Sequence, residues 1–299
     1  MLIALLSVLT LGGLICNWRL LQAARARAAR PSLEAIALGA ITNFLDTLGI
    51  GSFAPTMAWL KLRNLVEDRL IPCTMLVGHT LPVIVQAIIY LVLLGVAVDP
   101  LLLLACSAAL LAGALLGAPL AAKLRTWIVQ LIVGAALILA ALLYTLTNLG
   151  LMPAPGAAGS LPLALAVIAV IANFVFGALL NFGIGNYAPS LVMFSLMGMD
   201  PRLAFPIMAG GAALAASGAS LRHIAIGEID LRIAIGLTIG GIPAVLLAAF
   251  AVKTMPIEML RWLVVIVVVY TGVVVLRAAQ RGWRNSDPRA NAIGAAVSK

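Results

Sequence analysis

Two copies of one heptapeptide are the part of this sequence best suited to chemistry. Gly49-Ile50-Gly51-Ser52-Phe53-Ala54-Pro55 returns 134 positions later as Gly183-Ile184-Gly185-Asn186-Tyr187-Ala188-Pro189, and the ungapped register continues to Pro72 and Pro206. Glycine permits the sharp turn that breaks a helix, and proline fits the first turn of the helix that follows. Each copy therefore predicts a helix start with free N–H groups, which can bind an anion.

Both predicted helix starts lie in very apolar sequence, and no Lys or Arg lies deep inside any apolar segment. Two helix ends that approach from opposite sides would hold an anion by partial charges alone, typically ~0.3–1 kcal/mol per exposed end. Asn43, Thr47 and Gly51 are four apart and would share a face if the helix reached that far. For each Asn, the alternative is a helix–helix hydrogen bond. The candidate substrate-binding residues at the two breaks are Asn43, Thr47, Gly49, Gly51, Ser52, Asn181, Gly183, Gly185 and Asn186.

Two titratable side chains lie near the first heptapeptide. Asp46 is the acidic residue deep inside an apolar segment, and His79 lies beside a kink predicted at Pro82. Ionisable residues within a membrane are functional candidates, so both are candidates for carrying a coupled proton, and His79 also for substrate contact. The alternatives are a paired structural carboxyl group and a structural histidine. Phe53 and Tyr187 occupy matching places and are candidate gates, with simple packing as the alternative.

The composition excludes a soluble protein. The chain is 64% hydrophobic with 10% charged residues, and its mean hydropathy is +1.16, whereas soluble domains have about 25% charged residues. The net charge of +9 does not indicate nucleic-acid binding, because the basic residues lie at segment ends. We find no catalytic pair of carboxylates, no metal-ligand cluster and no nucleotide loop, so we expect neither an enzyme nor a cofactor or metal. The scattered Cys16, Cys73 and Cys106 form no zinc motif.

The apolar segments that must position these residues are of two kinds. Each interrupted segment is interpreted as a re-entrant hairpin, because a half-helix over 52–60 would rise about 13 Å, roughly half of a ~30 Å hydrocarbon core. Uninterrupted segments are expected at 2–18, 70–95, 100–121, 127–148, 203–221, 232–252 and 257–277, and interrupted ones at 33–60 and 161–196. We therefore predict seven full transmembrane helices plus two hairpins.

The basic residues favour this hairpin topology. With hairpins, all of the 19 basic residues except Arg202, Lys253 and Arg261 fall on one side, which the positive-inside rule makes cytoplasmic. The first hairpin then enters from the cytoplasm and the second from outside, so the two halves are inverted repeats. Transporters with this architecture bind substrate where the repeats meet. The alternative is that the duplication reflects only ancestral packing.

The predicted fold is thus an all-α membrane protein built from inverted repeats. We expect it in a bacterial inner membrane, with the N-terminus outside and the C-terminus in the cytoplasm. Its parts are an N-terminal transmembrane helix with a basic loop (1–30), a first repeat (31–148), an uncharged linker (149–160), a second repeat (161–278) and a basic cytoplasmic tail (279–299).

Except for the tail, nearly the whole chain resembles the TauE/SafE family of sulfite exporter-like anion permeases. The resemblance implies a carrier of sulfite, thiosulfate, sulfonates or other small anions. Ser52-Phe53 and Asn186-Tyr187 replace glycines of the Gly-rich turn common in the family, which leaves the identity of the anion open. The motifs that carry the resemblance are the two heptapeptides, Asp68-Arg69-Leu70-Ile71-Pro72, Val77-Gly78-His79-Thr80-Leu81-Pro82 and Gly198-Met199-Asp200-Pro201.

Three functional alternatives stay open. One is a channel-like anion facilitator, since two uncharged half-sites permit rapid passage. Another is a carrier of small organic carboxylates, and the third is an accessory membrane subunit. The expected partners are a small inorganic or organosulfur anion, the lipid bilayer and a coupled proton, with no nucleic acid. A homodimer is compatible with the sequence but not required by it.

Overall fold

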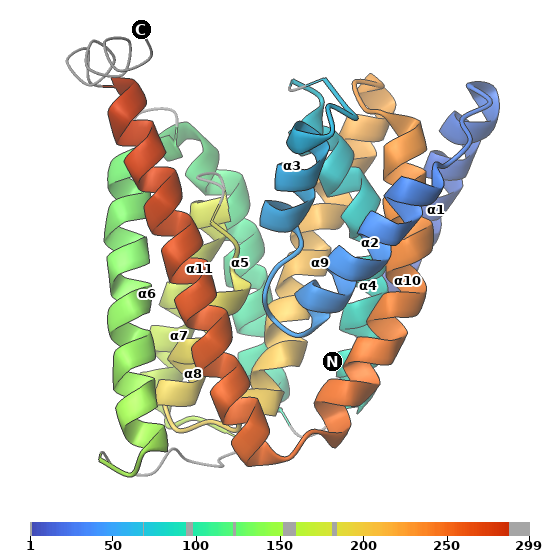
Figure 1. The fold of residues 1–299 in the computed structure, drawn as a ribbon. Helices are drawn as coiled ribbons and strands as arrows, with labels where there is room; N and C mark the ends of the chain where they lie inside the picture. The colour runs from blue at the N-terminus through green and yellow to red at the C-terminus, as the bar shows by residue number, and fades with distance from the viewer. Residues whose placement is uncertain are drawn as a thin grey trace, which may run out of the picture.

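The computed structural model describes residues 2–67, 69–93, 98–121, 124–151, 160–180 and 184–286, which form eleven α-helices and no strand (Figure 1). Seven of these helices are long and apolar enough to cross a membrane, which confirms the predicted all-α membrane fold with seven spans. The helices are α1 (Leu2–Ala26), α2 (Leu33–Thr47), α3 (Phe53–Leu62), α4 (Ile71–Leu93), α5 (Pro100–Ala121), α6 (Thr126–Asn148), α7 (Leu163–Leu179), α8 (Tyr187–Leu196), α9 (Pro201–Ile226), α10 (Leu231–Thr254) and α11 (Ile257–Ser286).

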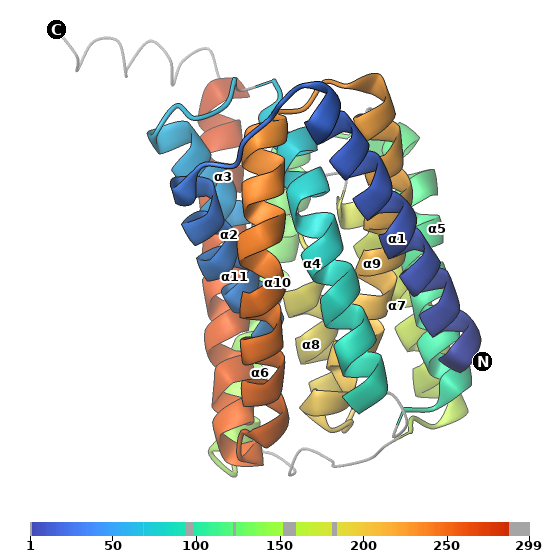
Figure 2. The ribbon, with the colours of Figure 1, turned by 90° about the vertical axis from the view of Figure 1, so that its right-hand side faces the viewer.

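The helices after α1 fall into two series of the same order. In α2–α6 and again in α7–α11, two short helices flank a break and three long helices follow. Helix α4 packs on α9 and α6 packs on α11, so equivalent helices pair with each other. By contrast, α2 packs on α10 and α7 packs on α5, so the first helix of each series packs on a helix of the other series. Helix α1 lies outside this arrangement, against α4, α9 and α10 (Figure 2).

The two exchanged helix pairs are in backbone contact. A Cβ atom on Gly240 of α10 would collide with the carbonyl group of Ile36 on α2, and one on Gly177 of α7 would collide with the carbonyl group of Leu110 on α5. Small residues permit this close approach of membrane helices, where packing rather than a hydrophobic driving force holds them together. These contacts fix the helices that lead into both breaks.

Several helices extend beyond the predicted apolar segments. Helix α1 continues through Arg19 and Arg25 to Ala26, and α11 continues to Ser286, so the start of the expected tail is helical. Both extensions are rich in alanine, glutamine and arginine, which favour a helix even where the sequence is no longer apolar. Residues 152–159 of the expected linker and 287–299 of the expected tail lie outside the described part of the chain.

The N-termini of several helices differ in whether a side chain caps them. Those of α2, α5, α9 and α10 are capped by side chains: Ser32 accepts from the Ala35 N–H group at 3.1 Å, and Asp99, Asp200 and Asp230 accept from N–H groups two residues later at 2.7, 2.9 and 2.9 Å. The cap residues of α3 and α8, Ser52 and Asn186, make no such side-chain bond although both are buried. The two helices that follow the breaks therefore start inside the protein without a cap from their own N-cap side chain.

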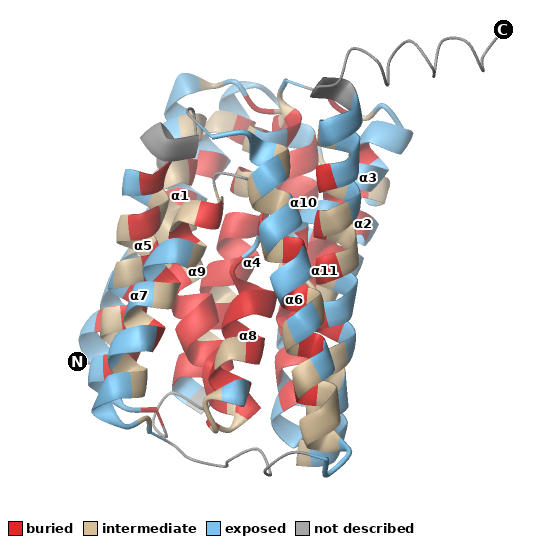
Figure 3. Ribbon diagram, turned by 90° about the vertical axis from the view of Figure 1, so that its left-hand side faces the viewer, coloured by how far each residue is buried: buried red, intermediate tan, exposed pale blue. Residues whose placement is uncertain are grey.

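The two short helices after the breaks differ in their surroundings. Helix α8 packs against α6, α7, α9 and α11 and is buried near the centre of the molecule (Figure 3). Among the described helices, α3 packs to a comparable extent only on α2 and α4, and one face of it is exposed. The equivalent residues Phe53 and Tyr187 show this difference, with exposures of 45% and 7%. The pairing is therefore symmetrical, but the packing of the two half-helices is not.

Candidate functional site

The first break is a turn of two left-handed glycines. Helix α2 ends at Thr47, and Gly49 and Gly51 have φ angles of +93° and +90°, which residues with a side chain adopt only with strain. The helix therefore does not reach Gly51, so the condition for a face shared by Asn43, Thr47 and Gly51 is not met. The glycines of the turn break the helical periodicity.

The second break is described only in part. Gly185 does not have a positive φ, and nothing lies within 4 Å of the Cβ position it lacks. Asn181 and Gly183, two of the predicted binding residues, lie outside the described residues. The repeated sequence thus does not produce the same backbone at Gly51 and Gly185.

Asp46 occupies the start of α3. Its Oδ1 atom accepts a hydrogen bond from the backbone N–H group of Ser52 at 2.7 Å, and the Ser52 hydroxyl group lies beside the same carboxyl group. Asp46 is 4% exposed, and its Oδ2 atom has no hydrogen-bond partner among the described residues. Negative groups are stabilised at a helix N-terminus, so the protein's own carboxyl group fills a position predicted to bind substrate.

His79 joins the helices on either side of this break. The Asn43 amide donates to the Gly39 carbonyl oxygen at 2.8 Å, which turns Asn43 Oδ1 toward His79 Nδ1 at 3.1 Å. Because an amide oxygen only accepts, Nδ1 carries the hydrogen. The second ring nitrogen, Nε2, lies 3.0 Å from the Thr56 hydroxyl group, which also lies 2.7 Å from the Ser52 carbonyl oxygen. One imidazole ring thus connects α2, α3 and α4.

Three of the predicted binding residues have partners within the protein. Besides Asn43 and His79, Thr47 donates its hydroxyl to the Asn43 carbonyl oxygen at 2.7 Å, and its own carbonyl oxygen accepts from the Tyr90 hydroxyl group at 2.7 Å. In this conformation these contacts hold the first break in shape. The helix–helix hydrogen bond weighed for Asn43 is present, in the form of its bond to a histidine on α4.

The start of α8 has unused hydrogen-bond donors. The N–H groups of Asn186, Tyr187 and Ala188 donate to no residue in the described part of the chain. The Asn186 side chain points away to α9, where it donates to the Met208 carbonyl oxygen at 3.3 Å. No carboxyl group corresponds to Asp46, because Leu180 is the residue 134 positions later. Among the described residues, the second break therefore has no counterpart of the Asp46 carboxyl group.

Gln86 on α4 lies beside this second break and was not predicted from the sequence. It is fully buried, and neither atom of its carboxamide has a hydrogen-bond partner among the described residues. Its neighbour is the side chain of Tyr187, whose buried hydroxyl group also lacks a partner of normal geometry. A glutamine in the middle of the apolar segment 70–95 is a signal that could have identified it.

The chain was compared with known protein families once these features were established. Residues 165–298 match the family model described as sulfite exporter TauE/SafE. This part of the chain, somewhat less than half of it, is therefore similar to the TauE/SafE family. The match runs from α7 to beyond α11 and confirms the resemblance seen in the motifs. No curated protein and no solved structure matches the chain.

TauE/SafE is a family of transporters, and the match covers 134 of the 299 residues. The seven long apolar helices are those of a multi-pass membrane protein. In the described residues no group of three or more His, Cys, Asp or Glu residues could hold a metal ion. The match to the TauE/SafE model does not locate a binding site.

The two candidate gates, Phe53 and Tyr187, differ in how far they are exposed. The Phe53 ring lies at the exposed face of α3, with its centroid 5.7 Å from that of His79. Tyr187 is enclosed by α4 and the first break, near Gln86, Tyr90 and Asp46. Movement of Phe53 would open or close the edge of α3, whereas the Tyr187 hydroxyl group faces the interior.

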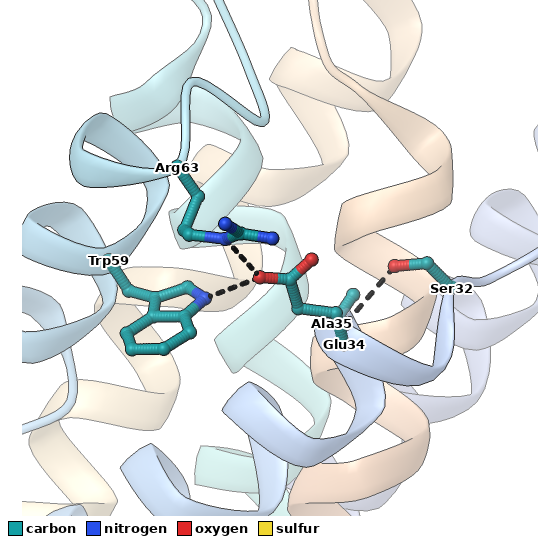
Figure 4. Close-up of polar contacts among 5 residues, drawn as sticks. All are labelled: Ser32, Glu34, Ala35, Trp59 and Arg63. Atoms are coloured by element: carbon teal, nitrogen blue, oxygen red, sulfur yellow. Dashed lines mark hydrogen bonds and ion pairs between the residues drawn. The ribbon is translucent and has the colours of Figure 1, made fainter.

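An ion pair fastens the far end of α3 to α2 (Figure 4). Glu34 Oε1 accepts from Arg63 Nε and from Trp59 Nε1, both at 3.0 Å. The Arg63 guanidinium group holds the pKa of the Glu34 carboxyl group below its usual value. At the corresponding places the second half has Ile168, Met193 and Met197. Only the first hairpin can therefore have this ion pair.

Proposed function

We propose that this protein is a secondary transporter that moves sulfite, a sulfonate or a related sulfur oxyanion through a bacterial inner membrane. The observation that carries the proposal is the pair of helix starts at Ser52 and Asn186, both buried within the bundle and neither capped by the side chain of its own N-cap residue. Helix starts bind anions through N–H groups and partial positive charge. The TauE/SafE match supports a sulfur oxyanion as the substrate.

In this proposal the two broken segments are re-entrant hairpins in an inverted repeat. The first hairpin, α2–α3, enters from the cytoplasm, and the second, α7–α8, enters from outside. The C-terminus and most of the basic residues then lie in the cytoplasm, as the positive-inside rule requires. The short α3 and α8, of 10 residues each, agree with half-crossings of the bilayer.

The unequal packing of α3 and α8 supports alternating access. Helix α8 is closed onto α6 and α11, while α3 has no comparable contact with these helices among the described residues. In an inverted repeat the opposite conformation follows by exchanging the roles of the halves, so that α3 closes and α8 separates. This asymmetry favours a carrier over a channel-like facilitator, and the present conformation is the one open on the α3, or cytoplasmic, side.

Proton coupling is assigned to Asp46, with His79 in a supporting position. The carboxylate at the α3 helix start repels a second anion in the same interior, because like charges interact strongly at low dielectric constant. A proton on Asp46 removes this charge, so one proton accompanies one anion. His79 fixes the geometry of α3 through Thr56, and its protonation would place donors on both ring nitrogens.

The experiment that tests the proposal is anion flux into proteoliposomes. Sulfite is offered together with a competing panel of sulfate, thiosulfate, sulfonates and carboxylates, with and without a pH gradient. Saturable sulfite uptake that sulfonates inhibit is the expected result. Uptake of carboxylates without sulfite would discard the sulfur assignment, and a single-channel current would show a facilitator. Absence of any flux would point to an accessory subunit.

A further inference from the structure

The tip of the first hairpin, at Gly49, is in contact with three helices of the second series. The position that a Cβ atom of Gly49 would take lies 3.4 Å from Leu191 Cδ2 on α8. The same position lies 3.8 Å from Val267 Cγ1 on α11 and 3.9 Å from Phe205 Cε1 on α9. The side chains of Leu191, Phe205 and Val267 are fully buried. Helices α8, α9 and α11 therefore converge on one turn of the first series.

The hydrophobic contacts of this hairpin distinguish its tip from its body. Leu48 and Ile50, on either side of Gly49, pack against the main hydrophobic core, which includes the three side chains named above. Ala35 and Leu60, in the body of the hairpin, belong to a smaller core that they share with residues of α4 and α10. Among the described residues, the hairpin therefore joins the main core at its tip.

Tyr90 on α4 holds the tip in this position. Its hydroxyl group donates to the carbonyl oxygen of Thr47, the last residue of α2, at 2.7 Å. Its ring centroid lies 5.1 Å from the ring centroid of Phe205, and both side chains are fully buried. The tip is thus fixed by a hydrogen bond to α4 and by apolar contacts to α8, α9 and α11.

The contacts of the tip lie beyond the middle of the membrane, as seen from the side on which the first hairpin enters. Helix α2 has 15 residues and rises about 22 Å, which is more than half of a ~30 Å hydrocarbon core. Phe205 lies close to the start of α9, and Val267 lies within the first half of α11. Both helices start on the opposite side in the proposed topology. The contacts therefore form a layer in the outer half of the bilayer.

An apolar layer of this kind stops an anion. An ion that enters it loses its water and finds no hydrogen-bond partner, which is strongly unfavourable, and hydrophobic constrictions close channels by excluding water. Leu191, Phe205 and Val267 have hydrocarbon side chains without a polar atom. Their packing on the turn therefore separates the first break from the outside.

We infer that Leu191, Phe205 and Val267 form the outer gate of the carrier by packing on the turn at Gly49, and that this gate is closed in the present conformation. The inference rests on the proposed function, because a gate requires a transport path. In the opposite conformation the turn separates from the three side chains while α3 closes the cytoplasmic side.

The test is cysteine labelling of the full-length protein in its membrane with an impermeant maleimide, after the three native cysteines are replaced. Leu191→Cys reports access to the gate from outside. Met57→Cys, at a position 37% exposed on α3, reports access from the cytoplasm. Each reporter is combined with a second substitution that weakens the gate or serves as the control.

Phe205→Ala and Val267→Ala each remove apolar contacts from the gate. Leu9→Ala is the matched control, because Leu9 is buried to a similar degree, with 1% exposure, on a helix that belongs to neither series. Either gate variant should label Leu191→Cys from outside about tenfold faster, since a loss of only ~1.4 kcal/mol from the closed form changes the ratio of open to closed molecules tenfold.

The same gate variants should slow the labelling of Met57→Cys from the cytoplasm, because molecules that are open to the outside are closed at α3. Loss of local packing alone would not have this opposite effect on a distant reporter. Leu9→Ala should change neither labelling rate. If Phe205→Ala does not fold, Val267→Ala decides, because it removes only two carbon atoms.

Unchanged labelling of Leu191→Cys in the gate variants would overturn the inferred gate. Faster labelling of Leu191→Cys without slower labelling of Met57→Cys would overturn it as well, because the three side chains would then serve only to pack the protein.

Failure of the inferred gate and failure of the proposed function give different results. Sulfite flux together with unchanged labelling in the gate variants would overturn the gate alone. Opposite changes in the two labelling rates without flux of any anion would support the gate and reject the proposed anion substrate.

Discussion

Asp46 Oδ1 lies 2.7 Å from the backbone nitrogen of Ser52 and bridges the turn between the two helices of the first hairpin. The protein thus supplies a carboxyl group to one of its own helix starts, whereas the residue that corresponds to Asp46 before the other start, at Asn186, is Leu180. In this respect the two halves of a repeated structure differ chemically where they are most alike in sequence. The predictions below follow from this difference and from the contacts around it.

Asp46→Asn should abolish the pH dependence of transport. In the wild type we expect uptake to rise as the external pH falls, because protonation of the carboxyl group removes the charge that repels the anion. The amide carries no charge at any pH, so uptake by the variant should be flat with pH, and a proton gradient should no longer drive accumulation. Uptake of radiolabelled methanesulfonate into proteoliposomes measures this, because the charge of a sulfonate does not change between pH 5 and 8. Accumulation equal to the wild type would reject Asp46 as the proton carrier.

His79→Ala should destabilise the first hairpin. It leaves Asn43 Oδ1 without a donor and removes the Thr56 contact, and each unpaired buried group costs about 1–3 kcal/mol. A double-mutant cycle with Asn43→Leu should show a coupling energy of about 0.5–3 kcal/mol if the pair acts as one unit. Thermal unfolding in detergent measures both the destabilisation by His79→Ala and the coupling energy. Additive effects of the two changes would contradict the hydrogen-bonded pair.

Gly51→Ala should destabilise the protein more than Gly185→Ala. Nothing lies within 4 Å of the Cβ position at either glycine, so neither substitution meets a steric clash. Only Gly51 has a positive φ, of +90°, and an alanine in the left-handed region costs about 1–2 kcal/mol. The comparison therefore measures the free-energy cost of a left-handed backbone conformation at matching positions of the two repeats. Equal melting temperatures for the two variants would show that the first turn does not need its left-handed glycine.

Lowering the pH should weaken the attachment of the C-terminal end of α3 to α2. Because Arg63 lowers the pKa of Glu34 in the folded protein, the stability from this pair is complete above the pKa of the unfolded state. It is lost as pH falls through the folded pKa. Hydrogen exchange of α3 amides, corrected for intrinsic rates, should therefore quicken in acid. Glu34→Gln should exchange at the faster rate already at neutral pH and should respond little to acid. If neither acid nor Glu34→Gln changes the hydrogen-exchange protection of α3, the Glu34–Arg63 pair does not stabilise this helix.

Cysteine labelling should distinguish the two half-helices. Met57 on α3 is 37% exposed and the equivalent Leu191 on α8 is fully buried. After Cys16, Cys73 and Cys106 are replaced, a membrane-impermeant maleimide should label Met57→Cys from the cytoplasmic side and leave Leu191→Cys unlabelled. A transported anion should slow the labelling of Met57→Cys as α3 closes. Labelling of Met57→Cys only from the periplasm would reverse the topology, and equal rates at both positions would contradict the asymmetric state.

The spans and breaks were predictable because they depend on local sequence. The length of an apolar segment decides whether it crosses a bilayer, and Gly49-Ile50-Gly51 with Pro55 marks a helix end and a new start whatever surrounds it. The partners of the site residues were not predictable in this way. Asn43 bonds to His79, 36 positions away, and the bond exists only because α2 and α4 pack together. Gln86 was missed because a single amide in an apolar helix has no meaning until its neighbour is known.

The asymmetry of the two hairpins could not have been read from the repeat. Phe53 and Tyr187 occupy the same place in the motif, yet one is at an exposed edge and the other is enclosed. A carrier must close one side at a time, so its two halves adopt different packing in any single conformation. Aligned sequences describe what the halves share, and the structure shows that α8 is enclosed whereas α3 has an exposed face.

The exchange of first helices between the two series, α2 onto α10 and α7 onto α5, has a consequence for how the protein folds. Neither half contains the helix against which its own first helix packs, so the first half made alone would leave the backbone surfaces at Ile36 and Leu110 uncovered. Neither series can therefore complete its packing before the other is in place, and the two halves depend on each other for assembly.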